Sequence, residues 1–256
     1  MGILQTILAA KREEIAALRQ TALPLAPERR PLSLKRSAGD PLRLIAEIKF
    51  RSPSAGALST RLSVAERARA YERGGASMVS VLCDTTHFGG SFQHLRLARE
   101  SCGLPLLCKD FVIDEVQLDA ARAFGADAVL LIACCLDAPA LQRLIQAARE
   151  RQLQPFVEVA SDDEARLALR LGADLVGVNA RDLDTLKMDV GKAQQVLARL
   201  PDSVTRVHLS GLKAAEDVAA LASSPADAAL VGEALMRQDD PEPLLAGLVA
   251  RARAQA

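Results

Sequence analysis

The sequence predicts an α/β protein, a single (β/α)8 TIM barrel with an N-terminal helical extension. Eight short apolar segments alternate with helix-like stretches, and such nearly continuous apolar runs are typical of parallel strands covered on both faces. Glycine and alanine recur together where a helix ends and the next strand begins, at 75–76, 125–126 and 172–173. The 256 residues, 50% of them hydrophobic, suffice for one large core, so we treat residues 1–256 as one domain. An open doubly wound sheet is the alternative, but no Gly-x-Gly-x-x-Gly turn follows the first strand.

The expected elements begin with an extension over residues 1–43. Its first part is an amphipathic helix that has to pack on the barrel, with an apolar face formed by Ile3, Leu4, Ile7, Leu8, Ile15 and Leu18. Residues 21–43, rich in proline, arginine and leucine, are expected to be an irregular connection. Strands are expected at 44–50, 78–84, 104–111, 128–134, 154–160, 175–181, 205–211 and 228–235, and a terminal helix over 237–256.

Composition favours a small-molecule ligand. The chain has 32 Lys+Arg and 32 Asp+Glu, so it has no overall field that attracts nucleic acid or an anionic membrane. No apolar run reaches the roughly 18 residues of a membrane span, and the N-terminus lacks the features of a signal peptide, so a cytoplasmic protein is expected. The five cysteines form no Cys-x-x-Cys pair, which argues against a metal site, and Cys134 and Cys135 are interpreted as buried small hydrophobic residues.

The first strand contains two charges where a buried strand should have none. Glu47 and Lys49 are two residues apart, so they project from the same face of the strand. Burying them unpaired would cost several kcal/mol. The pair therefore predicts a polar pocket, although two opposite charges that neutralise each other at a strand end are the simpler alternative.

Further polar residues stand where the other strands end, and in a barrel these ends converge on one mouth. Two lysines and two glutamates there can hold their pKa values apart and so supply an acid and a base for proton transfer. Glycines that end the seventh and eighth strands expose backbone N–H groups to an anion, which predicts a phosphorylated substrate. The residues are Glu47, Lys49, Lys109, Asp110, Glu158, Asn179, Arg181, Ser210, Gly211, Gly232 and Glu233.

Simpler interpretations exist for single members of this set. Ser210-Gly211 and Gly232 are also explained as turns, and Asp110 equally well as a cap of the next helix. Arg181-Asp182 fits a surface ion pair of little consequence. The prediction therefore depends on the convergence of these residues more than on any one of them.

Longer segments resemble a known family over nearly the whole chain. They are Ile45-Ala46-Glu47-Ile48-Lys49 with Ser52-Pro53-Ser54, Phe88-Gly89-Gly90-Ser91, Lys109-Asp110-Phe111-Val112-Ile113-Asp114, Gly125-Ala126-Asp127 with Leu130-Leu131-Ile132, Val157-Glu158-Val159, Gly177-Val178-Asn179-Ala180-Arg181-Asp182-Leu183 and Val231-Gly232-Glu233-Ala234-Leu235-Met236. Together they resemble the indole-3-glycerol-phosphate synthase family of tryptophan biosynthesis.

The resemblance implies a decarboxylating, ring-closing lyase without a cofactor or metal. Such an enzyme converts 1-(2-carboxyphenylamino)-1-deoxyribulose 5-phosphate to indole-3-glycerol phosphate with loss of CO₂ and water. A monomer is one option that the sequence leaves open, and the sequence does not tell whether other tryptophan-pathway enzymes associate with the chain.

The resemblance also implies roles for individual residues. Lys109 would be the general acid at the C2′ carbonyl, and Lys49 would bind the substrate carboxylate and assist later proton transfer. Glu158 and Glu47 would move the protons of dehydration and rearomatisation, in an order that the sequence leaves open, while Asn179 and Arg181 orient polar groups. The remaining matched positions bind substrate: Ser52 in the first-strand motif, Ser210, Gly211, Gly232 and Glu233 at the phosphate, and Pro53, Phe88, Phe111, Leu130, Leu183 and Leu186 as an apolar wall.

One position departs from the family pattern. Where the family usually has Glu in Val-x-Glu-Ser-Gly, this chain has Leu209, and the neighbouring His208 should point to the other side of the strand. Three interpretations stay open. They are a working synthase in which Glu47 and Glu158 suffice, a diverged paralogue that closes a related anilino sugar phosphate, and a non-catalytic barrel that binds a phosphorylated ligand. Retention of both lysines and both glutamates argues against the last.

Overall fold

The computed structural model describes residues 2–53 and 56–256, so Ser54 of the first-strand motif lies outside the described residues. Eight parallel strands form a closed barrel in the order β1-β10-β9-β8-β7-β6-β5-β4, which confirms the predicted fold class. The strands are β1 (Arg43–Ile48), β4 (Met78–Leu82), β5 (Leu106–Lys109), β6 (Ala128–Ile132), β7 (Gln154–Val159), β8 (Leu175–Asn179), β9 (Thr205–Leu209) and β10 (Ala228–Val231).

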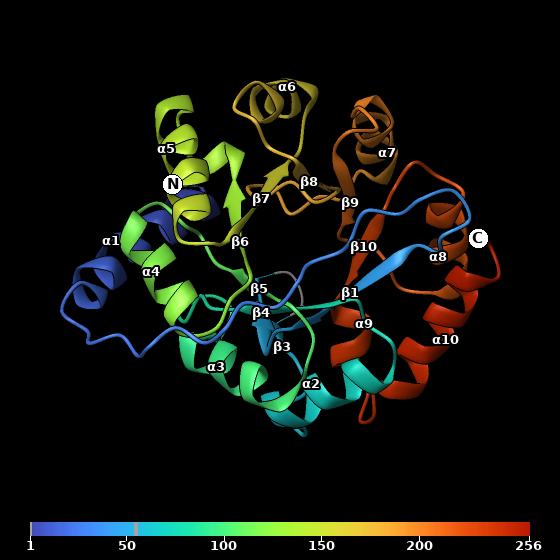
Figure 1. Cartoon of the computed structure of the whole chain (residues 1–256), viewed down its shortest axis with the longest axis horizontal. Helices are drawn as coiled ribbons and strands as arrows, with labels where there is room; N and C mark the ends of the chain where they lie inside the picture. Colours follow the sequence, from blue (N-terminus) through green and yellow to red (C-terminus); the bar gives the residue numbers. More distant parts are fainter. Residues whose placement is uncertain (1, 54–55) are drawn as a thin grey trace.

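Helices surround the ring of strands (Figure 1). Those that follow the strands are α2 (Val64–Arg73), α3 (Phe92–Ser101), α4 (Glu115–Ala123), α5 (Ala138–Glu150), α6 (Asp162–Arg170), α7 (Val190–Arg199), α8 (Ala215–Ala222), α9 (Glu233–Met236) and α10 (Glu242–Arg253). Each of α2 to α7 begins at a Ser or Asp whose side chain accepts a hydrogen bond from a backbone N–H of the first turn. These caps fix where each loop at the barrel mouth ends.

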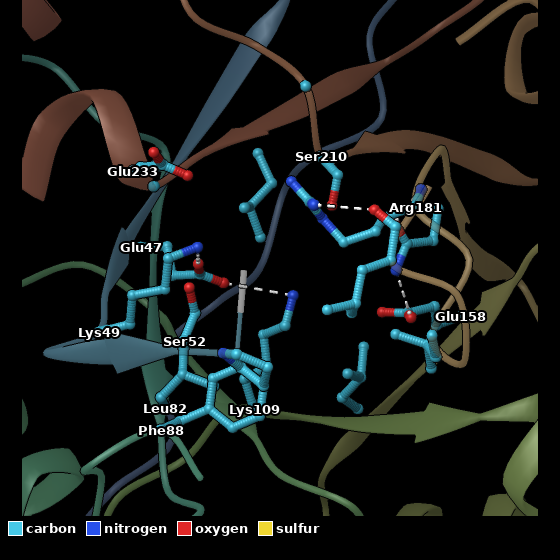
Figure 2. A pocket seen from close by; sticks show the side chains of 18 of the residues that line it. Glu47, Lys49, Ser52, Leu82, Phe88, Lys109, Glu158, Arg181, Ser210 and Glu233 are labelled. Carbon is cyan, nitrogen blue, oxygen red and sulfur yellow. Dashed lines mark hydrogen bonds and ion pairs between the residues drawn. The ribbon is translucent and has the colours of Figure 1, made fainter. Parts of the chain in front are cut away.

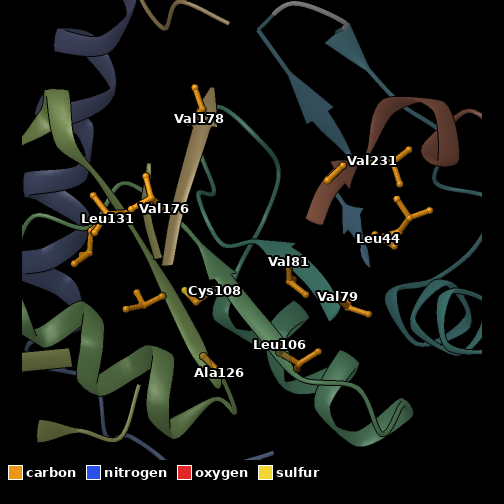
Figure 3. Close-up of a cluster of buried hydrophobic side chains, with 14 of the residues drawn as sticks. Leu44, Val79, Val81, Leu106, Cys108, Ala126, Leu131, Val176, Val178 and Val231 are labelled. Atoms are coloured by element: carbon orange, nitrogen blue, oxygen red, sulfur yellow. The ribbon is translucent and has the colours of Figure 1, made fainter. Parts of the chain in front are cut away.

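Side chains of each strand alternate between two apolar layers. The outer layer packs against the helices and includes Leu44, Val79, Leu106 and Val176 (Figure 3). The inner layer fills the barrel and includes Ile45, Met78, Leu107, Phe156, Val207 and Leu209. Because both faces are buried, the strands show nearly continuous apolar runs in the sequence.

The N-terminal extension covers both ends of the barrel. Helix α1 (Ile3–Leu18) lies at the mouth and buries Leu4, Ile7 and Ile15, as its amphipathic pattern predicts. Residues 21–42 form the expected irregular connection, which crosses to the other end of the barrel. There the backbone N–H of Arg30 donates to Asp127, and Lys35 pairs with Asp227 at 3.1 Å.

Several predicted boundaries differ from the structure. Strand β6 ends at Ile132, and the one-turn 3-10 helix η1 (Ala133–Cys135) follows, so Cys134 is exposed and Cys135 half-buried. The interpretation of both cysteines as buried was therefore wrong, because they lie on a turn at the rim and not in a strand. In the last predicted strand, α9 takes over after Gly232. The antiparallel pair β2 (Arg51–Ser52) and β3 (Gly56–Ala57) was not predicted, since two-residue strands show no periodicity.

In the part of the chain that the structure describes, no helix is long and apolar enough to cross a membrane.

Candidate active site

One cavity of about 430 Å³ opens at the C-terminal ends of the strands. Every residue that the sequence analysis places in the site lines it. They are Glu47, Lys49, Ser52, Pro53, Phe88, Lys109, Asp110, Phe111, Leu130, Glu158, Asn179, Arg181, Leu183, Leu186, Ser210, Gly211, Gly232 and Glu233. The predicted convergence is therefore present in the structure, and what each residue does there is a question of chemistry.

An ion-paired cluster occupies the centre of the cavity. Glu47, on β1, places Oε1 at 2.8 Å from Nζ of Lys49 and Oε2 at 3.2 Å from Nζ of Lys109, at the end of β5. The Glu47 side chain is 2% exposed, whereas the two lysines are 18% and 19% exposed and face the cavity. Figure 2 shows Lys109 between Glu47 and Glu158. The simple alternative of two charges that neutralise each other does not describe this cluster, because a second cation shares the same carboxylate.

The two carboxylates have opposite pKa shifts. Burial alone would raise the pKa of Glu47, but Lys109 and Lys49 bring it down to about 2. For Glu158, on β7, burial outweighs the effect of Lys109 and raises the pKa above its usual range. Burial lowers the pKa of Lys109, but Glu47 and Glu158 raise it overall. Near neutral pH the site thus holds an ionised Glu47 and a cationic Lys109. The pKa of Glu158 lies closer to neutral pH than that of an ordinary glutamate.

Asn179, at the end of β8, fixes one of these carboxylates. Its Nδ2 donates to Oε1 of Glu158 at 2.7 Å, and its Oδ1 accepts from the backbone N–H of Arg181 at 2.9 Å. The Arg181 guanidinium donates to the carbonyl of Leu186 at 3.2 Å and lines the cavity. The surface ion pair with Asp182 is therefore not what the structure shows for Arg181.

In Figure 2, Ser210 and Glu233, from the loops after β9 and β10, lie on the side of the cavity away from Phe88. Ser210 and Gly211 have φ angles of 70° and 90°, so the chain turns sharply where it enters the cavity. Lys213 and Arg237 line the same cavity as this turn and Glu233. The interpretation of these glycines as turns therefore holds in part. The turns also lie at a cationic wall of the cavity, which suits an anion.

Apolar side chains form the other wall. The rings of Phe88 and Phe111 lie with centroids 6.0 Å apart, and Pro53, Leu130, Leu183 and Leu186 complete the set expected from the sequence. Such a wall suits an aromatic group and lowers the local dielectric around the charges.

Comparison with known proteins agrees with this geometry. A family model described as indole-3-glycerol phosphate synthase matches residues 4–248. The chain belongs to this family. Among curated indole-3-glycerol phosphate synthases, it is 42% identical to one from Exiguobacterium sp. over 96% of this chain and 95% of the relative. It is also 42% identical to one from Kineococcus radiotolerans over 98% and 96% of the two chains.

Solved structures share the fold at low identity. One is 3-hexulose-6-phosphate synthase from Salmonella typhimurium, with a TM-score of 0.68 and 15% identity over 84% of this chain and all (100%) of that one. Another is thiamine phosphate pyrophosphorylase from Pyrococcus furiosus, with a TM-score of 0.64 and 16% identity over 86% and 99% of the two chains. At this identity these neighbours support the barrel fold alone.

Asp110 of this indole-3-glycerol phosphate synthase family member has a role that the sequence did not predict. It does not cap α4, since Asp114 does, and it instead pairs with Lys11 of α1 at 2.7 Å. Helix α1 also adds Ile3 and Ile7 to the cavity lining. The apolar face of α1 predicted packing on the barrel, but no pattern in the sequence says which end it covers. Arg237 had a usable signal, because it follows Glu233 by four residues and pairs with it at 2.8 Å.

The position that departs from the family pattern lies in the inner layer. Leu209 stands beside Asn179 in the sheet register, so it faces the barrel interior as expected, but it is 1% exposed and packs below the cavity. A Cβ on Gly177 would lie 2.7 Å from Cδ1 of Leu209, so the two positions fit closely. His208 is buried on the opposite face of β9.

Gly232 gives a direct test of the cluster geometry. A Cβ there would lie 2.6 Å from Oε1 of Glu47 and 3.1 Å from its Cβ, so Gly232→Ala must displace this carboxylate from the lysines. We expect kcat/KM for the family reaction to fall by about 10²-fold, because misplacing reacting groups by about 1 Å costs that much. Gly247→Ala, on α10 where a Cβ meets nothing within 4 Å, is the control and should keep wild-type kinetics. Unchanged kinetics in Gly232→Ala would mean that Glu47 does not need its observed position.

Proposed function

We propose that the chain converts 1-(2-carboxyphenylamino)-1-deoxyribulose 5-phosphate to indole-3-glycerol phosphate, CO₂ and water. The observation that carries this proposal is the cluster of Lys109, Lys49, Glu47 and Glu158, in one cavity between an apolar wall and a cationic end. An anilino sugar phosphate has the matching parts: an aromatic ring, a reacting carbonyl and a phosphate.

Ring closure needs an acid at the carbonyl. The ring carbon that bears the carboxylate attacks C2′, and Lys109 donates a proton to the carbonyl oxygen as the new carbon–carbon bond forms. Lys49 pairs with the substrate carboxylate until CO₂ leaves and the ring regains its aromaticity. Both lysines start as cations held by Glu47, which is 2.8 and 3.2 Å from their ammonium groups.

Dehydration needs a group that both gives and takes a proton. The C2′ hydroxyl leaves as water after it is protonated, and the loss of a proton from C1′ completes the indole. Glu158 suits these transfers because its pKa is raised, whereas Glu47, with a pKa of about 2, stays ionised and holds the lysines in place.

Binding is divided between the two ends of the cavity. We assign the aromatic ring to Phe88 and Phe111 and the phosphate to the turn at Ser210-Gly211, with Gly232, Glu233 and the nearby cations completing that end. Asn179 and Arg181 orient polar groups between the two ends. The monomeric state and the cytoplasmic location stay predictions.

Steady-state kinetics with the phosphorylated substrate and with its dephosphorylated analogue test this assignment. We expect turnover of the phosphorylated compound, followed by indole fluorescence, and a much lower kcat/KM for the analogue because it lacks the group that the cationic end binds. Equal kcat/KM values for both compounds would contradict the phosphate assignment, and turnover of neither would contradict the function.

Leu209→Glu separates a working synthase from a pocket adapted to another substrate. In a working synthase the new carboxylate reaches from below the cavity to one of the lysines that line it, and we expect turnover to rise by as much as the roughly 10²-fold of one positioned acid–base group. In an adapted pocket the buried charge is poorly solvated, and turnover or Tm should fall instead. Kinetics and a melting curve on this variant distinguish the two outcomes, and we expect the first. Unchanged values in both would show that position 209 does not influence the site.

A further inference from the structure

A buried lysine lies outside the catalytic cluster. Lys11, on α1, is 1% exposed, and its ammonium is surrounded by three carboxylates. Nζ lies 2.7 Å from Asp110, 3.0 Å from Asp84 and 2.6 Å from Glu14. Burial lowers the pKa of Lys11, but these carboxylates, Asp110 first, raise it overall, so the group is cationic at any physiological pH.

Two of these carboxylates, Asp84 and Asp110, each hold a different loop of the mouth. Asp84, after β4, accepts from the backbone N–H groups of His87 and Phe88 at 2.7 and 3.2 Å. Asp110, after β5, accepts from the backbone N–H of Phe111 at 2.9 Å and from Gln117 at 3.3 Å. These hydrogen bonds hold the backbone of Phe88 and Phe111, whose rings belong to the cavity wall.

Helix α1 contacts the loop after β4 a second time. Glu14, which pairs with Lys11, accepts a hydrogen bond from Oγ1 of Thr86 at 3.1 Å. Ile3 and Ile7 of the same helix line the cavity. One ammonium group therefore joins α1, the β4–α3 loop and the β5–α4 loop, and each of these three segments contributes to the cavity lining.

A stability role alone does not account for this cluster. Buried ion pairs contribute little net stability compared with apolar residues of similar size, because the charges lose their hydration. In this structure the short contacts of Lys11 define where α1 and the two loops lie relative to one another. Asp110, one of the residues that Lys11 contacts, directly follows Lys109 in the sequence, so its position affects that of Lys109.

We propose that Lys11 is a positioning residue: it holds α1 and the two loops in one arrangement, which fixes Phe88, Phe111 and the adjacent Lys109 around the substrate's aromatic ring. The part that concerns substrate rests on the proposed function. The part that concerns the three segments stands on the contacts alone.

The test compares Lys11→Met with Arg99→Met. Arg99 is a matched control, since it is also buried and pairs with a buried carboxylate, Asp127 at 2.8 Å, but at the opposite end of the barrel. Arg99→Met leaves one buried carboxylate without its ion-pair partner and Lys11→Met leaves two, so both variants should lower Tm. Only Lys11→Met should raise KM and lower kcat, with kcat/KM down by about 10²-fold, the scale of a 1 Å misplacement. Equal kcat/KM values in the two variants would overturn the proposal.

Amide hydrogen exchange gives a readout that does not depend on turnover. Lys11→Met should speed exchange in residues 84–90 and 110–117, whereas Arg99→Met should leave both segments as in the wild type. If the wild type does not turn over the substrate, the proposed function fails, and exchange still decides whether Lys11 holds the loops. Unchanged exchange in Lys11→Met would overturn the proposal.

A double variant covers the case in which Lys11→Met does not fold. Lys11→Met with Asp84→Asn removes one of the unpaired charges while the Asn oxygen can still accept from Phe88. We expect a higher Tm than in the single variant and a kcat/KM that stays low, because α1 is no longer tied to the β4–α3 loop. Recovery of kcat/KM together with Tm would show that Lys11 only balances charge, which contradicts a positioning role.

Discussion

Lys109→Ala is expected to lower kcat by about 10²–10⁴-fold, the usual contribution of a positioned general acid. Lys109 lies at the end of β5, with its ammonium 3.2 Å from Glu47, and it acts electrostatically on Glu158 as well. Its loss removes the proposed proton donor and raises the pKa of Glu158 further, since Lys109 lowers it in the wild type. The phosphate end is formed by other strands, so KM should change much less than kcat.

Steady-state kinetics followed by indole fluorescence measure this effect. The matched control is Lys192→Ala, because Lys192 is an exposed lysine on α7, and it should keep the wild-type kcat. A Lys109→Ala enzyme with kcat close to the wild-type value would refute the proposed acid.

Glu158→Gln is expected to lower kcat by a similar factor of about 10²–10⁴ and to change the pH profile. Glu158 has to be protonated before it gives its proton to the C2′ hydroxyl, and because burial raises its pKa, this acid form is lost as pH rises through a value above the usual range of a glutamate. The wild type should therefore show an alkaline limb in that range, and Glu158→Gln should lack it. An alkaline limb that persists in this variant would mean that another group titrates.

The melting temperatures of Glu158→Gln and Glu47→Gln give an independent check of the two pKa shifts, because the two substitutions should change Tm in opposite directions. The folded-state pKa of Glu158 is raised, so its ionised form disfavours folding above that pKa, and Glu158→Gln should keep or raise Tm at neutral pH. The pKa of Glu47 is lowered to about 2, so its ionised form stabilises the fold until pH falls toward that value. Glu47→Gln should therefore lower Tm at neutral pH. Equal shifts in both variants would contradict the separation of the two pKa values.

Much of the site could be predicted because a closed barrel brings the C-terminal ends of all its strands to one mouth. Residues at the ends of β1, β5, β7 and β8 are far apart in sequence, but the closed sheet brings Glu47, Lys109, Glu158 and Asn179 to one mouth. The apolar runs predicted the strands because both faces of the sheet are buried. The family resemblance added the expected role of each residue, which periodicity alone does not supply.

The missed features share a physical reason. Lys11 lies on a helix that also carries other charged residues, and its burial depends on Asp84 and Asp110, which are far away in sequence. Nothing local distinguishes it from a solvated lysine. Cys134 and Cys135 were misplaced for a related reason, since an apolar run does not show at which residue a strand gives way to a turn.

We infer that this cavity closes an anilino sugar phosphate to an indole. The most direct measurement incubates the purified wild-type chain with 1-(2-carboxyphenylamino)-1-deoxyribulose 5-phosphate and follows indole fluorescence and CO₂ release together. We expect indole-3-glycerol phosphate and CO₂ to appear in equal amounts, without an added metal or cofactor. Binding of the compound with release of neither product would contradict it.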